Sequence, residues 1–117
     1  DIREGRTIRV DDPDKYLKNV NFFLRFSANA DETMQELHDR PHPEKRYKAV
    51  VKALRFLMEN PRHPSLQTHP YSALKGNDGE KVFEAYAEQN TPAAYRIFFH
   101  YGKTKGEIVI LAITPHP

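Results

Sequence analysis

The chain has 117 residues, of which 38% are hydrophobic and 29% are charged, and it carries a formal net charge of +2. This length suits one domain with a modest core, and no apolar run approaches the roughly 20 residues that a membrane-spanning helix requires. The first five residues lack the apolar segment of a signal peptide, and the chain has no cysteine for disulfide or thiolate chemistry. We therefore expect a cytoplasmic protein that has no membrane partner.

The beginning of the chain differs in character from the rest. Residues 1–19 hold five acidic and five basic side chains. We interpret them as an N-terminal extension, followed by a single domain over residues 20–117. Residues 20–27 (Val-Asn-Phe-Phe-Leu-Arg-Phe-Ser) are mostly apolar and aromatic, and they predict the first strand of the sheet of this domain.

A short helix is expected next. Asn29 and Glu32 have the spacing of a capping box, in which a polar cap precedes a carboxylate by three residues. Met34 and Leu37 would then face inward from this helix. Residues 41–43 (Pro-His-Pro) end it, because proline cannot continue a helix.

The second helix has the clearest pattern in the chain. Its apolar residues recur at helical spacing and form one stripe: Tyr47, Val50, Val51, Leu54, Leu57 and Met58. These positions predict a helix over residues 44–59, which Pro61 ends. The basic residues form a separate stripe: Lys45, Lys48, Lys52 and Arg55. This basic stripe is either a solvated outer face or a surface that binds RNA or an acidic partner.

The last third of the chain reads as strands. Residues 62–76 contain several prolines and predict a loop. Residues 82–88, 95–101 and 108–113 are rich in aromatic and β-branched side chains, and short turn-like linkers join them into an antiparallel meander. With the first strand, this predicts an α+β fold in which a helical hairpin packs on a twisted, mainly antiparallel four-stranded sheet.

The middle strand of this meander contains an unusual arginine. Side chains alternate along a strand, so Arg96, Phe98 and His100 share one face and apolar residues take the other. A strand arginine among apolar neighbours needs water, an acidic partner or an anion. Arg96 is therefore either solvated or salt-bridged, or it is an anion-binding arginine on an open sheet face.

The order of four motifs resembles the RelE/ParE superfamily of bacterial toxin–antitoxin proteins. The motifs are Ala-Leu-Arg-Phe-Leu at 53–57 followed by Asn60-Pro61, Leu-Lys-Gly at 74–76, Tyr-Arg-Ile at 95–97, and Ile-Leu-Ala-Ile at 110–113 followed by His116. The resemblance covers about residues 20–117 and implies a helical hairpin on a twisted antiparallel sheet. The branch of the superfamily similar to YoeB has a glutamate shortly before Leu-Lys-Gly, where this chain has Ser72, and a tyrosine after its histidine, where this chain has Pro117.

This resemblance implies a toxin of a type II toxin–antitoxin pair, with a cognate antitoxin as partner and with the ribosome and its mRNA as target. Cleavage of RNA by its own 2′-hydroxyl needs a base, an acid and cations that stabilise the phosphorane. By the resemblance, Arg96, Lys75 and His116 are the catalytic candidates. The RNA-binding candidates are the basic stripe of the second helix together with one lysine of the last turn: Lys45, Lys48, Lys52, Arg55 and Lys103. Other members of the superfamily inhibit DNA gyrase by contact, so a non-catalytic binding protein, or an inactive relic, is the alternative.

Six histidines invite a test for metal binding. His38 and His42 are four residues apart, but Pro41 interrupts the helix that would align them. His63 and His69 lie in the proline-rich segment without the spacing of metal ligands. We therefore expect neither a metal site nor a cofactor.

Overall fold

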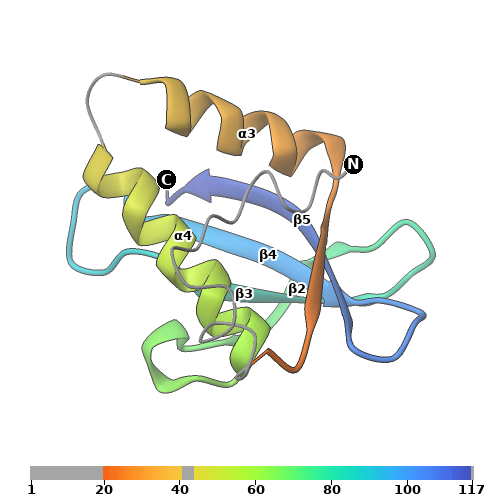
Figure 1. The fold of residues 1–117 in the computed structure, drawn as a ribbon. Coiled ribbons are helices and arrows are strands. Elements are labelled where there is room, and N and C mark those ends of the chain that lie inside the picture. The colour runs from red at the N-terminus through yellow and green to blue at the C-terminus, as the bar shows by residue number, and fades with distance from the viewer. Residues whose placement is uncertain (1–19, 41–43, 117) are drawn as a thin grey trace.

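The computed structural model describes residues 20–40 and 44–116, so residues 1–19, interpreted above as an extension, and the prolines of residues 41–43 lie outside the described residues. Figure 1 shows the elements in chain order: β1 (Phe23–Phe26), α3 (Ala28–Asp39), α4 (Glu44–Glu59), the 3-10 helix η1 (Pro64–Leu66), β2 (His69–Lys75), β3 (Lys81–Tyr86), β4 (Tyr95–Tyr101) and β5 (Glu107–Pro115). The helix predicted over residues 44–59 has the predicted bounds. Neither α3 nor α4 combines the length and the apolar composition that crossing a bilayer requires.

The described strands form one sheet in the order β1-β5-β4-β3-β2. β1 runs parallel to β5, and every other neighbouring pair is antiparallel. The predicted α+β class, the helical hairpin and the meander of the last three strands are confirmed. The prediction of four strands was wrong, because the sheet has five.

The additional strand is β2, at His69–Lys75, inside the segment that the sequence predicted to be a loop. It is an edge strand that contains Pro70, and its register with β3 is irregular between Pro70 and Lys75. Proline has no N–H to donate to a ladder. A sheet edge tolerates it because the outer side of an edge strand has no neighbouring strand to bond. Most of β2 is exposed, so it lacks the alternating apolar pattern that reveals a half-buried strand.

The N-cap of helix α3 is Ser27, not Asn29 as the capping-box spacing predicted. The Ser27 hydroxyl accepts a hydrogen bond from the Ala30 N–H at 3.0 Å and donates one to the Leu111 carbonyl at 2.8 Å. The same side chain therefore caps the helix and ties it to β5, which a local sequence pattern does not report. Met34 and Leu37 are buried, as predicted.

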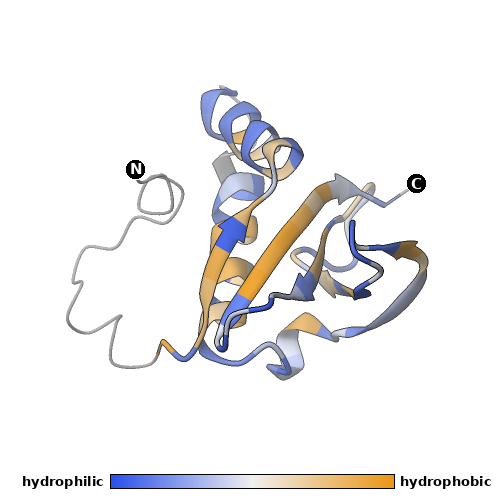
Figure 2. Ribbon diagram, turned by 90° about the vertical axis from the view of Figure 1, so that its right-hand side faces the viewer, coloured by the Kyte–Doolittle hydropathy of each residue, from blue (hydrophilic) through white to orange (hydrophobic). Residues whose placement is uncertain are grey.

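The core lies between the two helices and one face of the sheet. From α4, Val50, Leu54 and Leu57 are fully buried, and the other members of the predicted apolar stripe pack around them. From the sheet, Ile97 and Phe99 are fully buried in the same cluster. Figure 2 shows apolar residues, in orange, where the helices meet the central strands. Both helices therefore cover the same sheet face, and Arg96 points to the other face by alternation.

A buried carboxylate links the edge strand β1 to the β4–β5 turn. Glu107 is 7% exposed, and it accepts hydrogen bonds from Arg25 Nε and from the Thr104 N–H. Burial alone raises the pKa of Glu107, but the hydrogen bonds from Arg25 and Thr104, with the charges of Arg25 and His100, outweigh burial and leave this pKa below its ordinary value of 4.5.

We predict that this carboxylate makes the folding free energy sensitive to acid. Because its pKa is lower in the folded state, its contribution is complete well above pH 4.5 and is lost as the pH falls through the folded-state value. Glu107→Gln should be less stable than the parent at pH 7 and should lose less stability below pH 4.5. Urea unfolding at several pH values, with the exposed Glu32→Gln as control, measures this. Equal acid sensitivity in the parent and Glu107→Gln would contradict it.

Candidate functional site

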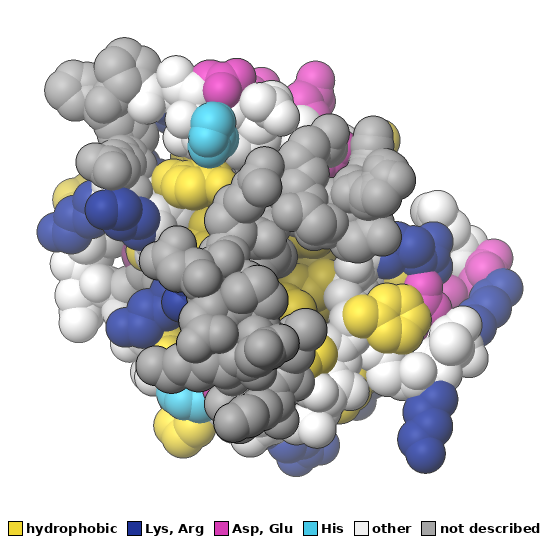
Figure 3. All heavy atoms as spheres, in the orientation of Figure 1, with side chains coloured by type: hydrophobic (Ala, Val, Ile, Leu, Met, Phe, Trp, Pro, Cys, Tyr) yellow, Lys and Arg dark blue, Asp and Glu magenta, His cyan; other side chains and the backbone are white. Residues whose placement is uncertain are grey.

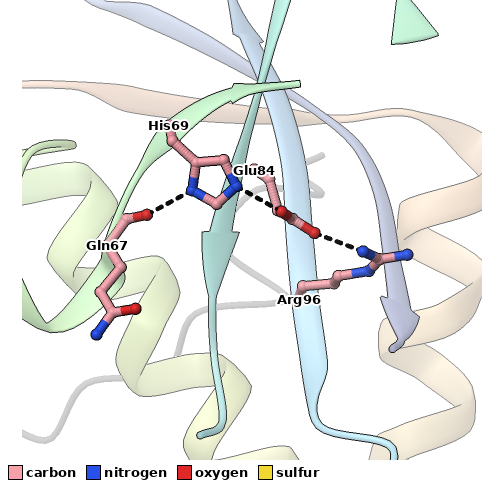
Figure 4. A network of polar contacts seen from close by, with 4 residues as sticks. All are labelled: Gln67, His69, Glu84 and Arg96. Atoms are coloured by element: carbon pink, nitrogen blue, oxygen red, sulfur yellow. Dashed lines mark hydrogen bonds and ion pairs between the residues drawn. The ribbon is translucent and has the colours of Figure 1, made fainter. Parts of the chain in front are cut away.

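A network of three ionisable side chains lies on the sheet face that points away from the helices. Glu84 of β3 is 3% exposed and lies between His69 of β2 and Arg96 of β4. Its Oε1 is 2.7 Å from His69 Nε2, and its Oε2 accepts a hydrogen bond from Arg96 Nη1 at 2.6 Å. Figure 4 shows this His69–Glu84–Arg96 network across three strands.

The strand register explains why these residues meet. His69 is directly opposite Glu84 in the β2–β3 pair, and Arg96 is opposite Tyr86 in the β3–β4 pair. Residues two apart on a strand share a face, so Arg96 reaches Glu84 diagonally. Three strands that are separate in the sequence therefore bring one carboxylate between two nitrogen groups.

Both ring nitrogens of His69 face oxygen atoms. Its Nδ1 is 2.8 Å from the Gln67 carbonyl oxygen, and its Nε2 is 2.7 Å from Glu84. A carbonyl and an ionised carboxylate only accept, so both contacts are hydrogen bonds when both ring nitrogens carry hydrogen. In that imidazolium form, the network places two positive groups around one negative group.

Arg96 is held by aromatic rings as well as by Glu84. Its guanidinium lies 4.9 Å from the Phe98 ring centroid and 5.9 Å from that of Tyr71, and these two rings are 4.8 Å apart. The side chain is 13% exposed, and its Nε is buried without a hydrogen-bond partner among the described residues. The salt-bridged interpretation of Arg96 is therefore correct. The guanidinium has five N–H donors, which leaves it able to bind an anion as well.

The residues predicted to be catalytic lie at two ends of the sheet. His116 is at the Arg96 end: its N–H donates to the Ala94 carbonyl at 2.8 Å, and Thr114 is opposite Arg96 in the β4–β5 register. Lys75 is at the other end, opposite Lys81. Tyr86, the residue opposite Arg96, is five positions along β3 from Lys81, which at about 3.3 Å per position is roughly 17 Å. The structure therefore brings His116, but not Lys75, to the end of the sheet that holds Arg96.

Lys103, an RNA-binding candidate, is also far from Arg96. It lies in the β4–β5 turn, where its Nζ is 3.1 Å from the Asp78 carboxylate. The hydrogen bond to Asp78, helped by the negative charge of that group, raises the pKa of Lys103 above its ordinary value. Both partners are largely exposed, so this pair contributes little to stability.

The basic stripe lies on the outer side of α4. Lys45, Lys48 and Lys52 are exposed and Arg55 is partly exposed. Figure 3 shows Lys and Arg side chains, in dark blue, at the α4 side of the molecule and acidic side chains, in magenta, at its top, where α3 lies. Arg46 of the same helix is different, because its Nε is 2.9 Å from Glu88 and anchors α4 to the linker between β3 and β4.

The sequence interpretation missed His69 and Glu84. His69 was assigned to a loop, and Glu84 was read as an ordinary strand residue. Alternation alone places Glu84 on one face of β3, but pairing it with Arg96 also requires the register. Ser72 occupies the place where the YoeB-like pattern has a glutamate, and it is exposed on β2. Within residues 20–40 and 44–116, no group of three or more histidine or acidic side chains is arranged to hold a metal ion.

Comparison with known proteins gives matches in structure alone. No family model matches the sequence, and no curated protein sequence matches it either. Ten chains of solved structures are similar in fold, and three of them illustrate the match. The matched chain of the archaeal RelE–RelB complex from Pyrococcus horikoshii OT3 is 16% identical with a TM-score of 0.57, and the match covers 81% of this chain and 94% of that chain.

The second structure is the YoeB dimer of Staphylococcus aureus, at 15% identity and TM-score 0.59, with 83% of this chain and 99% of YoeB covered. The third is the toxin–antitoxin complex RelBE2 of Mycobacterium tuberculosis, at 20% identity and TM-score 0.53, with 83% of this chain and the whole of the matched chain covered. These matches show that the chain has the fold of RelE/ParE superfamily toxins, as the resemblance implied.

Proposed function

We propose that this protein is the toxin of a type II toxin–antitoxin pair and that it cleaves mRNA on the ribosome. The observation that carries the proposal is Arg96, a guanidinium held in a fixed orientation on the sheet face that points away from the helices. Glu84 fixes it through one N–H, and His116 belongs to the same end of the sheet. The RelE/YoeB-like fold supports the same proposal.

Each residue has a role in the proposed reaction. The 2′-hydroxyl of the RNA attacks the adjacent phosphorus, a bond from 2′-oxygen to phosphorus forms, and the bond to the 5′-oxygen of the next nucleotide breaks. The N–H groups of Arg96 that do not bind Glu84 stabilise the negative charge of the phosphorane. His116 carries one proton, either away from the 2′-hydroxyl or to the departing 5′-oxygen, and water exchanges the other. Lys75, at the opposite end of the sheet, would contact the RNA strand away from this bond.

We further propose a cognate antitoxin as partner, because two of the similar solved structures are toxin–antitoxin complexes. The proposal of an antitoxin partner does not depend on the proposal of mRNA as the target, so it has its own test. Co-expression with the product of a neighbouring reading frame tests the antitoxin, and relief of growth arrest is the expected result.

A prediction follows for the basic stripe. Replacing Lys45, Lys48 and Lys52 by glutamine should weaken binding to ribosomes and RNA, because fewer counterions are released on binding. The slope of log affinity against log salt should become shallower by about 2 for single-stranded RNA, while stability changes by less than about 1 kcal/mol. Filter binding over a salt series measures this. Lys81→Gln with Lys105→Gln, both exposed but outside α4, is the control, and an unchanged slope in the triple variant would make the stripe a solvated face.

One observation favours the alternative, a non-catalytic protein that inhibits DNA gyrase or is an inactive relic. The Glu84 carboxylate offsets the charge of Arg96 at 2.6 Å. The parent protein should therefore be tested in two assays: primer extension on a message during in vitro translation, and supercoiling by purified gyrase. Cuts within the translated message, absent when ribosomes are omitted, are the expected result. Intact message with inhibited supercoiling would reject the nuclease in favour of the gyrase inhibitor, and no effect in either assay would favour the relic.

A further inference from the structure

A hollow of about 290 Å³ lies between α4, η1 and the end of β3. Leu66 and Ala53 are buried at its base. Lys52 and Phe56 line it from α4, and Tyr86 lines it from β3. The hollow is thus a small, mainly apolar space with aromatic and cationic groups at its wall.

The aromatic wall is reinforced from outside the hollow. His63 stacks on the Phe56 ring with the two centroids 3.9 Å apart and the planes 10° from parallel. The Lys52 Nζ lies 5.8 Å from the centroid of the same ring. Phe56 is therefore held in one orientation, with a positive charge beside it and the rest of the basic stripe further along the helix.

The hollow and the His69–Glu84–Arg96 network both lie at the end of β3, but on opposite faces of the sheet. Tyr86 lines the hollow, its ring is 5.8 Å from the His69 ring, and it is directly opposite Arg96 in the β3–β4 pair. On the other side, Gln89 of the hollow accepts a hydrogen bond from the Gln67 side chain at 3.4 Å, and the carbonyl of Gln67 contacts His69. The sheet therefore separates the hollow from Arg96, and the positive charge nearest to the hollow is that of Lys52, in the basic stripe of α4.

We propose that the hollow binds one unpaired base of an RNA strand that runs along the basic stripe of α4, while Lys52 contacts the backbone. The volume is just below the range of about 300–1,000 Å³ that is typical of pockets for drug-sized ligands, which suits a single base. Aromatic faces stack with any base, and a neighbouring cation attracts the phosphate chain. This inference rests on RNA being the target under the proposed function, but it concerns binding and not cleavage.

The test compares two probes on two proteins. The probes are a 2′-O-methyl RNA hexanucleotide, which cannot be cleaved through its 2′ position, and the same hexanucleotide with one abasic position. Ala49→Leu enlarges a residue that lines the hollow on α4, and both residues are good helix formers. The parent should bind the intact probe about tenfold more tightly than the abasic probe, in line with the contribution of one stacked base. Ala49→Leu should lose this difference and bind the abasic probe as the parent does.

Two further variants make the result decisive. Phe56→Leu keeps an apolar side chain without a ring and should lose the same difference, which serves if Ala49→Leu fails to fold by circular dichroism. Ala73→Leu, on exposed β2 and outside the hollow, should keep the difference in affinity.

Equal affinity of the parent for intact and abasic probes would overturn the inference even if the protein cleaves mRNA. Retention of the difference in Ala49→Leu and Phe56→Leu would overturn it too. Discrimination by a protein without cleavage would sustain the base site and reject only the nuclease. If the hollow takes an antitoxin side chain instead, Ala49→Leu will weaken antitoxin binding and leave RNA binding unchanged.

Discussion

Replacing Arg96 by alanine should reduce mRNA cleavage by roughly a hundredfold or more, which matches the loss of about 2–4 kcal/mol when one oriented charge-stabilising donor is removed. The reason is geometric. Glu84 and two aromatic rings hold the guanidinium in one orientation, and a mobile lysine does not reproduce that orientation. Primer extension on a translated message, comparing the parent with Arg96→Ala, measures the effect. His116→Gln should reduce cleavage too, with a changed pH profile, because it removes a proton carrier.

The controls must separate catalysis from folding. Arg96→Ala leaves the buried Glu84 with His69 as its remaining partner, and a buried charge that loses a partner destabilises the fold. The double variant Arg96→Ala with Glu84→Ala removes both charges and should recover stability without recovering cleavage. Arg62→Ala, an exposed arginine beyond α4, should leave cleavage unchanged. Cleavage at the parental rate by folded Arg96→Ala would exclude Arg96 from the reaction.

Replacing Leu54 by alanine should lower the free energy of unfolding by roughly 2–5 kcal/mol, because the change removes buried apolar surface and leaves a cavity. Leu54 is 0% exposed and lies at the centre of the face that α4 presents to the sheet. Chemical denaturation of both proteins measures the difference. For a domain of this size, such a loss is a large fraction of the total stability.

A matched leucine on the surface provides the comparison. Leu74 of β2 is 40% exposed, so Leu74→Ala should change the unfolding free energy by no more than about 0.5 kcal/mol. A loss below about 1 kcal/mol in Leu54→Ala, or equal losses in the two variants, would mean that Leu54 is not a core residue.

Patterns that are local in the sequence predicted the structure well. The apolar stripe of α4 recurs every three or four residues, so a single helix explains it and its bounds follow from Pro61 and the preceding prolines. The alternation in β4 likewise separated Ile97 and Phe99 from Arg96 without knowledge of any neighbour. The burial of these residues then follows, because the apolar face of the helix and the apolar face of the strand must pack against each other.

Features that depend on pairing could not be predicted. β2 is an irregular edge strand with Pro70, and its place beside β3 depends on long-range pairing that no pattern in its own residues reports. His69 and Glu84 are fifteen residues apart, and Glu84 and Arg96 are twelve apart, so the network exists only when three strands adopt one register. The position of Lys75 at the far end of the sheet follows from the same register.

The parallel pairing of β1 with β5 determines when the molecule can complete its fold. Phe23 pairs with Glu107, and the Ser27 cap reaches Leu111, so contacts between residues 84 positions apart close the sheet. Such long-range pairing is slow to form, since a large loop must be closed before any contact compensates for it. During synthesis β1 therefore remains without its partner until almost the whole of this domain has emerged from the ribosome. A polypeptide interrupted before β5 lacks both a finished core and the strand opposite Arg96, so we expect incomplete chains to lack the proposed cleavage activity.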